Sequence, residues 1–594
     1  METAQDRPAD AYRQLIDIGI ALSAERDPAR LRERILLEAK AFTNADAGTL
    51  YLKSKGKELQ FQILRNDTLG LAMGGTSGVE ISFPPVQLFT EKGEPNMRNV
   101  ASHCAHTGEL INVADAYSET DEFDFSGTQE FDRRTGYRCR SFLTVPLMNH
   151  NGFVIGVLQL INAKDASGHV VPFAAGILPM VQALASQAAV SIDNRLLIEE
   201  LKLLLDSFIS LIAAAIDTKS PYTGGHCQRV PLLTEMLVRA ACEAEDGPFK
   251  DFNLTEAEWY ELRVACWLHD CGKITTPEHI VDKATKLEAI YDRIHEVRMR
   301  FEVLKRDAEI KLLKGKLAGG DSAELQAAYE AEIATLDEEF AFVGECNVGG
   351  EFMAPAKIER LQQIAERTWT RTLSNRIGIS YAEQRRRDEI PERPLPVEEK
   401  LLEDRYDHVS PREGLRLSAP GNLWGFNLKA PEREFNLGEV YNLSIGRGTL
   451  TEEDRYKINE HMAQTIVMLE SLPWPRHLRR VPEYAGGHHE KMDGTGYPRG
   501  LKREEMSVPA RVMAIADIFE ALTAADRPYK PPKTLSESIR IMQFMVKDNH
   551  IDPDLFKLFL ESGVYKEYAA QHLKPEQIDE VDVEAEALRP ARSR

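Results

Sequence analysis

The chain has 594 residues, more than a single hydrophobic core usually serves, so two or three domains are expected. Apolar residues make up 43% of it and charged residues 28%, which is ordinary for a globular protein. The formal net charge of −21 repels polyanions and argues against binding of nucleic-acid polymers. A small anionic substrate would therefore need metal ions or a local basic cluster to be held.

The sequence shows no pattern of a secretory signal, a membrane span or a disulfide framework. Its start, METAQDRPADAYRQ, has no basic stretch followed by an apolar core, and no run approaches 18 apolar residues. The seven cysteines are scattered without a CxxC pair, which is typical of reduced thiols and disfavours a disulfide scaffold or a zinc ribbon. We therefore expect a cytoplasmic protein that does not cross a membrane.

The first part of the chain predicts an α+β domain with an antiparallel sheet over residues 10–180. Residues 10–40 carry apolar side chains at helical spacing and are expected to form one helix. Strand-like runs follow at 48–54 and 59–65. Two further apolar runs, 142–149 and 153–163, flank Asn151-Gly152, which is a hairpin signal.

A long helix is expected from about 174 to 220, with residues 181–220 as a linker between domains. Its apolar stripe is wide, and two interpretations carry about equal weight. The stripe packs on a neighbouring domain, or it forms a parallel dimeric coiled coil that transmits a signal. The stripe consists of Leu196, Leu197, Leu201, Leu204, Leu205, Phe208, Leu211, Ile212 and Ile216.

From residue 221 the pattern is almost entirely helical. Residues 286–343 are rich in Lys, Glu and Arg and contain no proline, with one break at Gly319-Gly320-Asp321, which predicts an antiparallel helical hairpin. Residues 347–445 hold many glycines and prolines and give no clear assignment.

Four histidine-containing segments and one apolar helix suggest a metal site. The histidines lie in GGHCQRV (224–230), WLHDCGK (267–273), INEHMAQ (458–464) and GGHHEKMDGTGYP (486–498). Asp517 lies in the apolar sequence AIADIFEAL, where an unpaired buried carboxylate would cost several kcal/mol, on the order of 3–5. Each element alone has an ordinary structural explanation, but together they supply imidazole and carboxylate ligands in the number that a two-metal phosphohydrolase requires.

The motifs HDCGK (269–273), HHEKMDGTGYP (488–498) and ADIFEALTAADRPYK (516–530) resemble the HD-GYP family of cyclic di-GMP phosphodiesterases, within the HD phosphohydrolases. The resemblance implies a catalytic domain formed by 221–286 and 447–565, with two iron or manganese ions whose activated hydroxide attacks the phosphate. The implied metal ligands are His226, His269, Asp270, His461, His488, His489 and Asp517. Asp270 and Lys273 would take part in catalysis, and Lys273, Arg527, Lys530 and Tyr497 would bind the substrate. For Glu490 and Asp493 two interpretations carry about equal weight: they support the ligand histidines, or they are solvated residues of the loop.

The sequence departs from the family pattern in four places. Ser220 stands where an aspartate is common. Tyr222 stands where members with a third metal have a glutamate, so two ions are expected, and Glu520 stands where an aspartate is usual. His461 follows His269 after 192 residues rather than roughly thirty, so residues 287–446 are expected to be an insertion that covers the site or makes a dimer contact. Residues 566–594 are expected to be a C-terminal tail.

The N-terminal domain resembles a GAF domain in residues 112–124, 134–147 and 156–165. Asn162, Lys164 and Phe173 partly match the pattern of nucleotide-binding members, although no Asp-Glu pair follows Phe173. A small-molecule or cyclic-nucleotide ligand is one interpretation, and a dimerisation domain with an empty pocket is the other.

We therefore expect an enzyme that hydrolyses cyclic di-GMP to pGpG or GMP, as a homodimer regulated by the GAF domain. In a competing interpretation the fold binds cyclic di-GMP, or the Gly-Tyr-Pro loop binds a diguanylate cyclase, without turnover. In a third, the site acts on another cyclic nucleotide.

Overall fold

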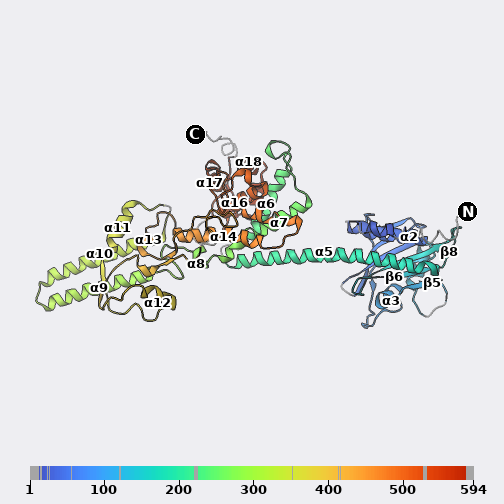
Figure 1. Ribbon diagram of the computed structural model, residues 1–594, viewed down its shortest axis with the longest axis horizontal. Helices are drawn as coiled ribbons and strands as arrows, with labels where there is room; N and C mark the ends of the chain where they lie inside the picture. The colour runs from blue at the N-terminus through green and yellow to red at the C-terminus, as the bar shows by residue number, and fades with distance from the viewer. Residues whose placement is uncertain are drawn as a thin grey trace. The chain divides into compact units, whose positions relative to one another are not determined.

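The structure, a computed structural model, describes residues 13, 16–22, 24, 25, 27–54, 57–118, 122–219, 225–350, 352–412, 414, 417–525 and 532–582. It divides into two compact units, Met1–Leu205 and Asp206–Arg594, and the division falls within the long helix α5 (Figure 1). Among the helices that these residues form, none is long and apolar enough to span a lipid bilayer.

The N-terminal unit is built on one antiparallel sheet with the strand order β3-β2-β1-β7-β6-β5. The central strands β1 (Ala45–Ser54) and β7 (Val154–Lys164) place Leu50 opposite Leu158. The predicted hairpin at Asn151-Gly152 joins β6 (Phe142–Met148) to β7. The remaining strands are β2 (Glu58–Asn66), β3 (Leu71–Gly74), β4 (Val86–Gln87), β5 (Ile111–Val113) and β8 (Val170–Val171).

Helices cover both faces of this sheet, and the alternation along β1 shows how. Leu50 and Leu52 point into a core shared with α2 (Pro28–Thr43) and the first turns of α5, while Tyr51 points into a second cluster under α3 (Val100–Thr107). Helix α4 (Ser126–Thr135) follows β5 in the chain. The predicted fold class, an α+β domain, a long helix and a helical C-terminal region, is confirmed.

The single helix expected over residues 10–40 is wrong. Helix α2 begins at Pro28, and the Asp27 side chain accepts hydrogen bonds from the amides of Ala29 and Arg30. Aspartate at the N-cap with proline at the first position is a strong helix start, which the apolar spacing alone does not reveal.

Helix α5 runs from Leu178 to Lys219, 42 residues, which at 1.5 Å per residue is about 63 Å. The predicted start near 174 is early by a few residues, because a short 3-10 turn, Ala175–Ile177, precedes the helix. Beyond the sheet-covering turns, much of its apolar stripe is exposed: Leu197 is 48% exposed, Leu201 69% and Phe208 52%.

The C-terminal unit is helical and holds the metal-ligand motifs. Its central helix α16 (Val508–Thr523) packs against α6 (His226–Cys242), and Phe519 of α16 contacts Phe559 and Tyr568 edge to face. The other helices of this bundle are α7 (Glu256–Leu268), α8 (Glu278–Val281), α14 (Glu452–Glu470), α15 (Val481–Gly486), α17 (Leu535–Lys547), α18 (Pro553–Glu561) and α19 (Val564–His572). The expected tail from 566 is corrected in part, since Tyr568, Ala569 and Gln577 are buried.

The segment 287–446 begins with the predicted helical hairpin, α9 (Ile294–Leu317) and α10 (Ser322–Val348), drawn side by side in Figure 1. Lys305 pairs with Asp337 and Lys316 with Gln326, a register that only antiparallel helices give. The unassigned part contains two small sheets, β9 (Thr368–Arg371) with β10 (Val397–Lys400) and β11 (Val409–Pro411) with β12 (Arg433–Asn436), and the helices α11 (Pro355–Ala365), α12 (Tyr381–Asp388) and α13 (Glu439–Leu443).

Candidate metal centre and a second pocket

The candidate ligands come from five places in the helical bundle. His226 is the first residue of α6, His269 and Asp270 directly follow α7, and His461 lies in the middle of α14. His488 and His489 follow α15, and Asp517 lies in α16. All seven ligands predicted from the sequence are thus described, and they converge on one region.

The ligand atoms form two groups, His226, His269, Asp270 and Asp517 in one and His461, His488 and His489 in the other, each with its atoms within 4.8 Å of one another. Asp270 faces both groups. Its Oδ2 lies 3.2 Å from the Nε2 atoms of His226 and His269, and its Oδ1 lies 3.3 Å from His461 Nε2 and 3.9 Å from His488 Nε2. This is the arrangement expected of a carboxylate that bridges two cations.

Three histidines are oriented by carbonyl groups of their own helical turn. The Nδ1–H groups of His269, His461 and His488 donate to the carbonyl oxygens of Cys266, Ile458 and Ala485, three residues earlier in each case. This bond fixes the tautomer and leaves each Nε2 lone pair directed inward, as metal-ligating histidines require.

The donor set fits divalent metal ions. Nε2 of His269, His461 and His488 and Oδ1 of Asp270 are buried without a hydrogen-bond partner, although buried polar atoms are normally paired. Burial lowers the pKa of His488 to about 4 and that of His489 well below its usual value, so both imidazoles are neutral at pH 7, the form that binds metal. Burial alone would raise the pKa of Asp270, but Lys273 and His269 hold it well below its usual range.

Gly272 brings the two groups of ligands together. It lies in the 3-10 turn Cys271–Thr275 against α14, and its amide donates to Thr465 Oγ1 at 2.9 Å. A β-carbon at this position would lie 2.0 Å from the carbonyl oxygen of His461 and 2.6 Å from the amide nitrogen of Thr465. Only glycine allows the backbone after Asp270 to approach the helix that carries His461 so closely.

Two supporting residues were missed by sequence reasoning. Glu520 is buried, with Oε2 at 2.5 Å from His226 Nδ1 and Oε1 accepting from Arg229 Nε at 2.7 Å. It follows Asp517 by three residues, so both carboxylates share a face of α16, and this spacing was the available signal. Asp217 accepts the amide of Gly225 just before His226.

The expected support of the ligand histidines by Glu490 and Asp493 is corrected. Glu490 is buried but accepts the amides of Arg499, Gly500 and Leu501, and so shapes the loop instead. Asp493 is exposed and accepts from Thr495.

Two of the expected substrate-binding residues are described, and both lie beside the ligands. Lys273 Nζ bonds Asp270, and Tyr497 stacks on His489 at 5.0 Å between ring centroids, with its hydroxyl 3.1 Å from His489 Nδ1. Arg527 and Lys530, and the departing positions Ser220 and Tyr222, lie outside the described residues.

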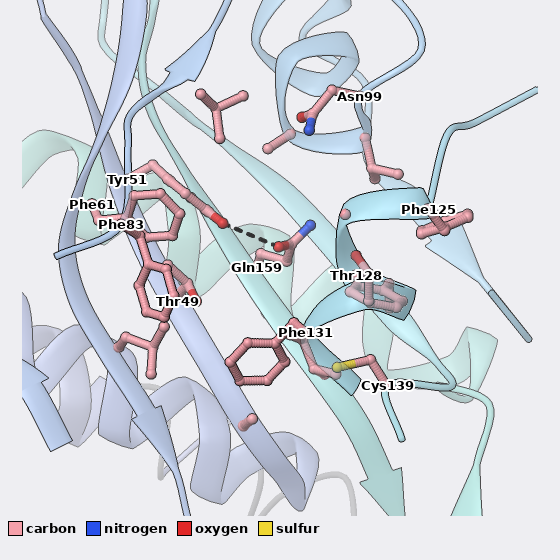
Figure 2. A pocket seen from close by; sticks show the side chains of 18 of the residues that line it. Thr49, Tyr51, Phe61, Phe83, Asn99, Phe125, Thr128, Phe131, Cys139 and Gln159 are labelled. Carbon is pink, nitrogen blue, oxygen red and sulfur yellow. Dashed lines mark hydrogen bonds between the residues drawn. The ribbon is translucent and has the colours of Figure 1, made fainter. Parts of the chain in front are cut away.

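A second candidate site lies in the N-terminal unit. A cavity of about 570 Å³ opens between the sheet, α3 and α4. Figure 2 shows the rings of Phe61, Phe83 and Phe131 along its wall and the amide of Gln159 in its floor, where Gln159 accepts a hydrogen bond from Tyr51.

The residues that partly match the nucleotide-binding GAF pattern do not line this cavity. Asn162 bonds the Tyr137 hydroxyl and the Arg138 carbonyl oxygen, Lys164 pairs with Asp46, and Phe173 lies in the core under α2. The partial match to the pattern therefore identifies no residue of the cavity wall, and a ligand in this cavity would contact other residues.

Comparison with known proteins identifies two domains. Residues 27–192 match the model of the GAF domain and residues 396–555 that of an HD domain, which confirms both resemblances at the level of domains. The HD domain implies binding of divalent metal, consistent with the two ligand groups. The HD match starts inside the segment expected to be an insertion and does not include His226, His269 or Asp270.

Curated relatives match over short stretches. The chain is 44% identical over 83 residues to the 3'3'-cGAMP-specific phosphodiesterase 1 of Vibrio cholerae, 14% of this chain and 19% of that protein. It is 44% identical over 79 residues to a cyclic di-GMP phosphodiesterase of Pseudomonas aeruginosa, 13% of this chain and 18% of that protein. The chain thus spans about a fifth of the length of these relatives.

Among solved structures, the GAF domain of an Acinetobacter phosphoenolpyruvate-protein phosphotransferase is similar. It is 14% identical, covers 31% of this chain and 92% of its own, and has a TM-score of 0.22.

The close approach at Gly272 yields a prediction. Gly272→Ala should separate Asp270 from His461 and weaken metal binding at least tenfold, so that the purified protein retains less metal, since changes around ligands typically cost about 10–100-fold in metal affinity. Elemental analysis measures this, and circular dichroism checks the fold. The matched control is Gly344→Ala in α10, where an added β-carbon meets nothing within 4 Å. Equal metal content in both variants would contradict the proposed ligand geometry.

Proposed function

We propose that the C-terminal unit is a metal-dependent phosphodiesterase that hydrolyses cyclic di-GMP to pGpG or GMP. The observation that carries the proposal is the position of Asp270, whose two oxygens face two separate groups of imidazoles. The names of the curated relatives support the class of substrate.

His226, His269, Asp270 and Asp517 would hold one ion, and His461, His488 and His489, with Asp270, the other. Iron or manganese suits these nitrogen and oxygen ligands. When bound, such a pair of ions supplies an activated water and offsets the charge of the phosphoryl group.

The chain's own groups would bind and orient the phosphodiester. Lys273, whose ammonium bonds Asp270, lies where it can donate to a phosphoryl oxygen and stabilise the negative charge that grows there. Tyr497 closes the site beside His489. Arg527 and Lys530 would contact a phosphate or a guanine, as the family resemblance implies.

A second substrate, 3'3'-cGAMP, is favoured by the name of one relative, and it shares the same ring of two phosphodiesters. The alternative of a receptor that binds a cyclic dinucleotide or a diguanylate cyclase without turnover predicts no product. Parallel assays of both dinucleotides separate these readings.

The hydrolysis prediction uses the full chain loaded anaerobically with iron or manganese. Wild type should hold two ions per chain and convert cyclic di-GMP to a linear product, seen by chromatography, and Asp270→Ala should lose at least about 10³-fold of the rate because the shared ligand is gone. Asp251→Ala, an exposed aspartate of the same unit, should match wild type. Absence of product from loaded wild type would favour the receptor, and a higher kcat/KM for 3'3'-cGAMP would change the assigned substrate.

We further propose that the N-terminal pocket binds a small ligand with a flat ring. Phe61, Phe83 and Phe131 offer aromatic surface, and the Gln159 amide and Thr49 hydroxyl offer hydrogen bonds at the floor. The size, about 570 Å³, suits a mononucleotide-sized molecule.

Cyclic GMP and cyclic AMP serve as probes of this pocket. One of them should raise the melting temperature of the wild-type chain, and Phe131→Ala should weaken its binding about tenfold through loss of ring stacking of roughly 1–1.5 kcal/mol. Phe153→Ala, an exposed phenylalanine of the same unit, is the control. Titration calorimetry that shows no binding of either probe would restrict the ligand to another class or support the empty dimerisation domain.

We also propose that α5 pairs in a parallel homodimer. Val190, Asn194, Leu197, Leu201, Leu204, Phe208 and Leu211 alternate at spacings of four and three residues, the pattern of a coiled-coil seam, and all are exposed. Asn194 meets Asn194 of a second copy only if the helices run parallel and in register, and a single buried asparagine specifies that register.

The dimer prediction compares two leucines of equal exposure. Leu201 on the seam is 69% exposed and Leu203 beside it is 68% exposed. Leu201→Glu should convert the dimer to a monomer in light scattering, while Leu203→Glu should leave it intact. Asn194→Cys should form an intermolecular disulfide on mild oxidation. If both glutamate variants behave alike, the seam is wrong.

A further inference from the structure

A short segment of the expected insertion lies against the residues that support the metal centre. Phe426 and Leu428 are buried in a cluster with Tyr456, Ala463 and Ile466 of α14, and Trp424 and Tyr497 pack at its edge. Helix α14 carries His461, and Tyr497 stacks on His489. The segment therefore touches the supports of two ligands of the same group.

Backbone hydrogen bonds join this segment to the loop 490–500. The amide of Asn427 donates to the carbonyl oxygen of Pro498 at 2.6 Å, and Arg499 Nε donates to the carbonyl oxygen of Trp424 at 2.9 Å. Arg499 also pairs with Glu470 of α14 at 2.8 Å and lies 5.8 Å from the centre of the Phe426 ring. The two residues that follow Tyr497 are thus held from the side of the insertion.

The segment has a fixed shape of its own. The side-chain oxygen of Asn422 accepts the amides of Trp424 and Phe426 at 3.1 and 2.9 Å, and its amide group donates to the carbonyl oxygen of Phe426 at 2.8 Å. The rings of Trp424 and Phe426 stack with a centroid distance of 5.9 Å and an angle of 10°. A preorganised segment can hold another loop without being ordered by it.

Glu490 holds the same loop from within, through the amides of Arg499, Gly500 and Leu501. The loop is therefore braced on two sides, by a buried carboxylate and by the insertion. Loss of the outer brace should let Tyr497 move while the turn around Glu490 persists.

We propose that residues 422–428 form a loop clamp, which positions Tyr497 and, through the stacked rings, His489. Its members are positioning residues and do not touch the substrate. The kinetic part of this inference rests on the proposed phosphodiesterase activity, while the structural part does not. In this proposal the insertion supports the geometry of the site. That role differs from the two expected from the sequence, a cover over the site and a dimer contact.

The structural test measures hydrogen exchange of the full-length, metal-loaded protein in peptides that cover residues 490–503. Phe426→Ala should speed exchange of the Tyr497 amide, which donates to the carbonyl oxygen of His489, at least tenfold, while the amides of 499–501, which Glu490 accepts, should change less. The matched control is Phe342→Ala, a buried phenylalanine of the same insertion that also carries an arginine, Arg360, over its ring. Trp424→Ala, at a half-buried site, is the milder second variant if Phe426→Ala misfolds. Unchanged exchange in a folded Phe426 or Trp424 variant overturns the clamp.

The kinetic test uses cyclic di-GMP as the probe. Phe426→Ala should lower kcat/KM about tenfold or more, because small displacements of positioned groups cost up to roughly 10²-fold, and Phe426→Met should recover part of the loss. Phe342→Ala should leave kcat/KM unchanged. Faster loop exchange with unaltered kinetics overturns the positioning role, and absence of turnover in wild type overturns the proposed function while the exchange result still decides the clamp.

Discussion

The C-terminal unit depends on keeping one ionised carboxylate, that of Asp270, almost completely out of water. A buried charge without partners is unstable, and here the ammonium of Lys273 pairs with it. The Nε2 atoms of imidazoles from four places in the chain lie within 3.9 Å of its oxygens, where metal ions would be held between them and the carboxylate. Their convergence explains the packing of the bundle, since the start of α6, the middle of α14 and the segments after α7 and α15 must all meet at this point. Gly272 removes the one side chain that would keep α14 away.

Much of the precision at this centre comes from the backbone. His269, His461 and His488 each bond the carbonyl oxygen three residues earlier, so the helical turn that places the ring also sets its tautomer. His226 stands first in its helix and has no preceding turn to use, and it takes the buried carboxylate of Glu520 instead. The Nδ1 atoms of these four histidines are therefore held by a carbonyl group of the same helical turn in three cases and by a side chain from another helix in the fourth, while Nδ1 of His489 lies beside the Tyr497 hydroxyl.

The convergence of the candidate ligands could be predicted because each lies in a contiguous motif whose residue types indicate metal binding. Their binding of metal stays a prediction. Contacts between distant segments could not be predicted, and Glu490 shows why: it adjoins His489 in sequence, yet its side chain turns to amides ten residues further on. The start of α2 depends on the cap by Asp27, which apolar spacing does not record. Residues 422–428 approach Pro498 across some seventy residues of sequence without any periodic pattern, so only coordinates reveal their contact.

The separation of 192 positions between His269 and His461 also bears on how such a site can be assembled. The entropy lost on closing a flexible loop grows only with the logarithm of its length, so extending roughly thirty residues to this length costs about 1.6 kcal/mol. The intervening chain has its own core, including Leu287, Val343, Leu401 and Leu443, and the buried ion pair of Arg300 with Glu439. Once that core has formed, the effective loop is far shorter than the sequence separation. A chain with this topology can therefore acquire a whole folded subdomain between two candidate ligands at little cost in free energy. Folding of the subdomain before the bundle would speed the meeting of these two residues.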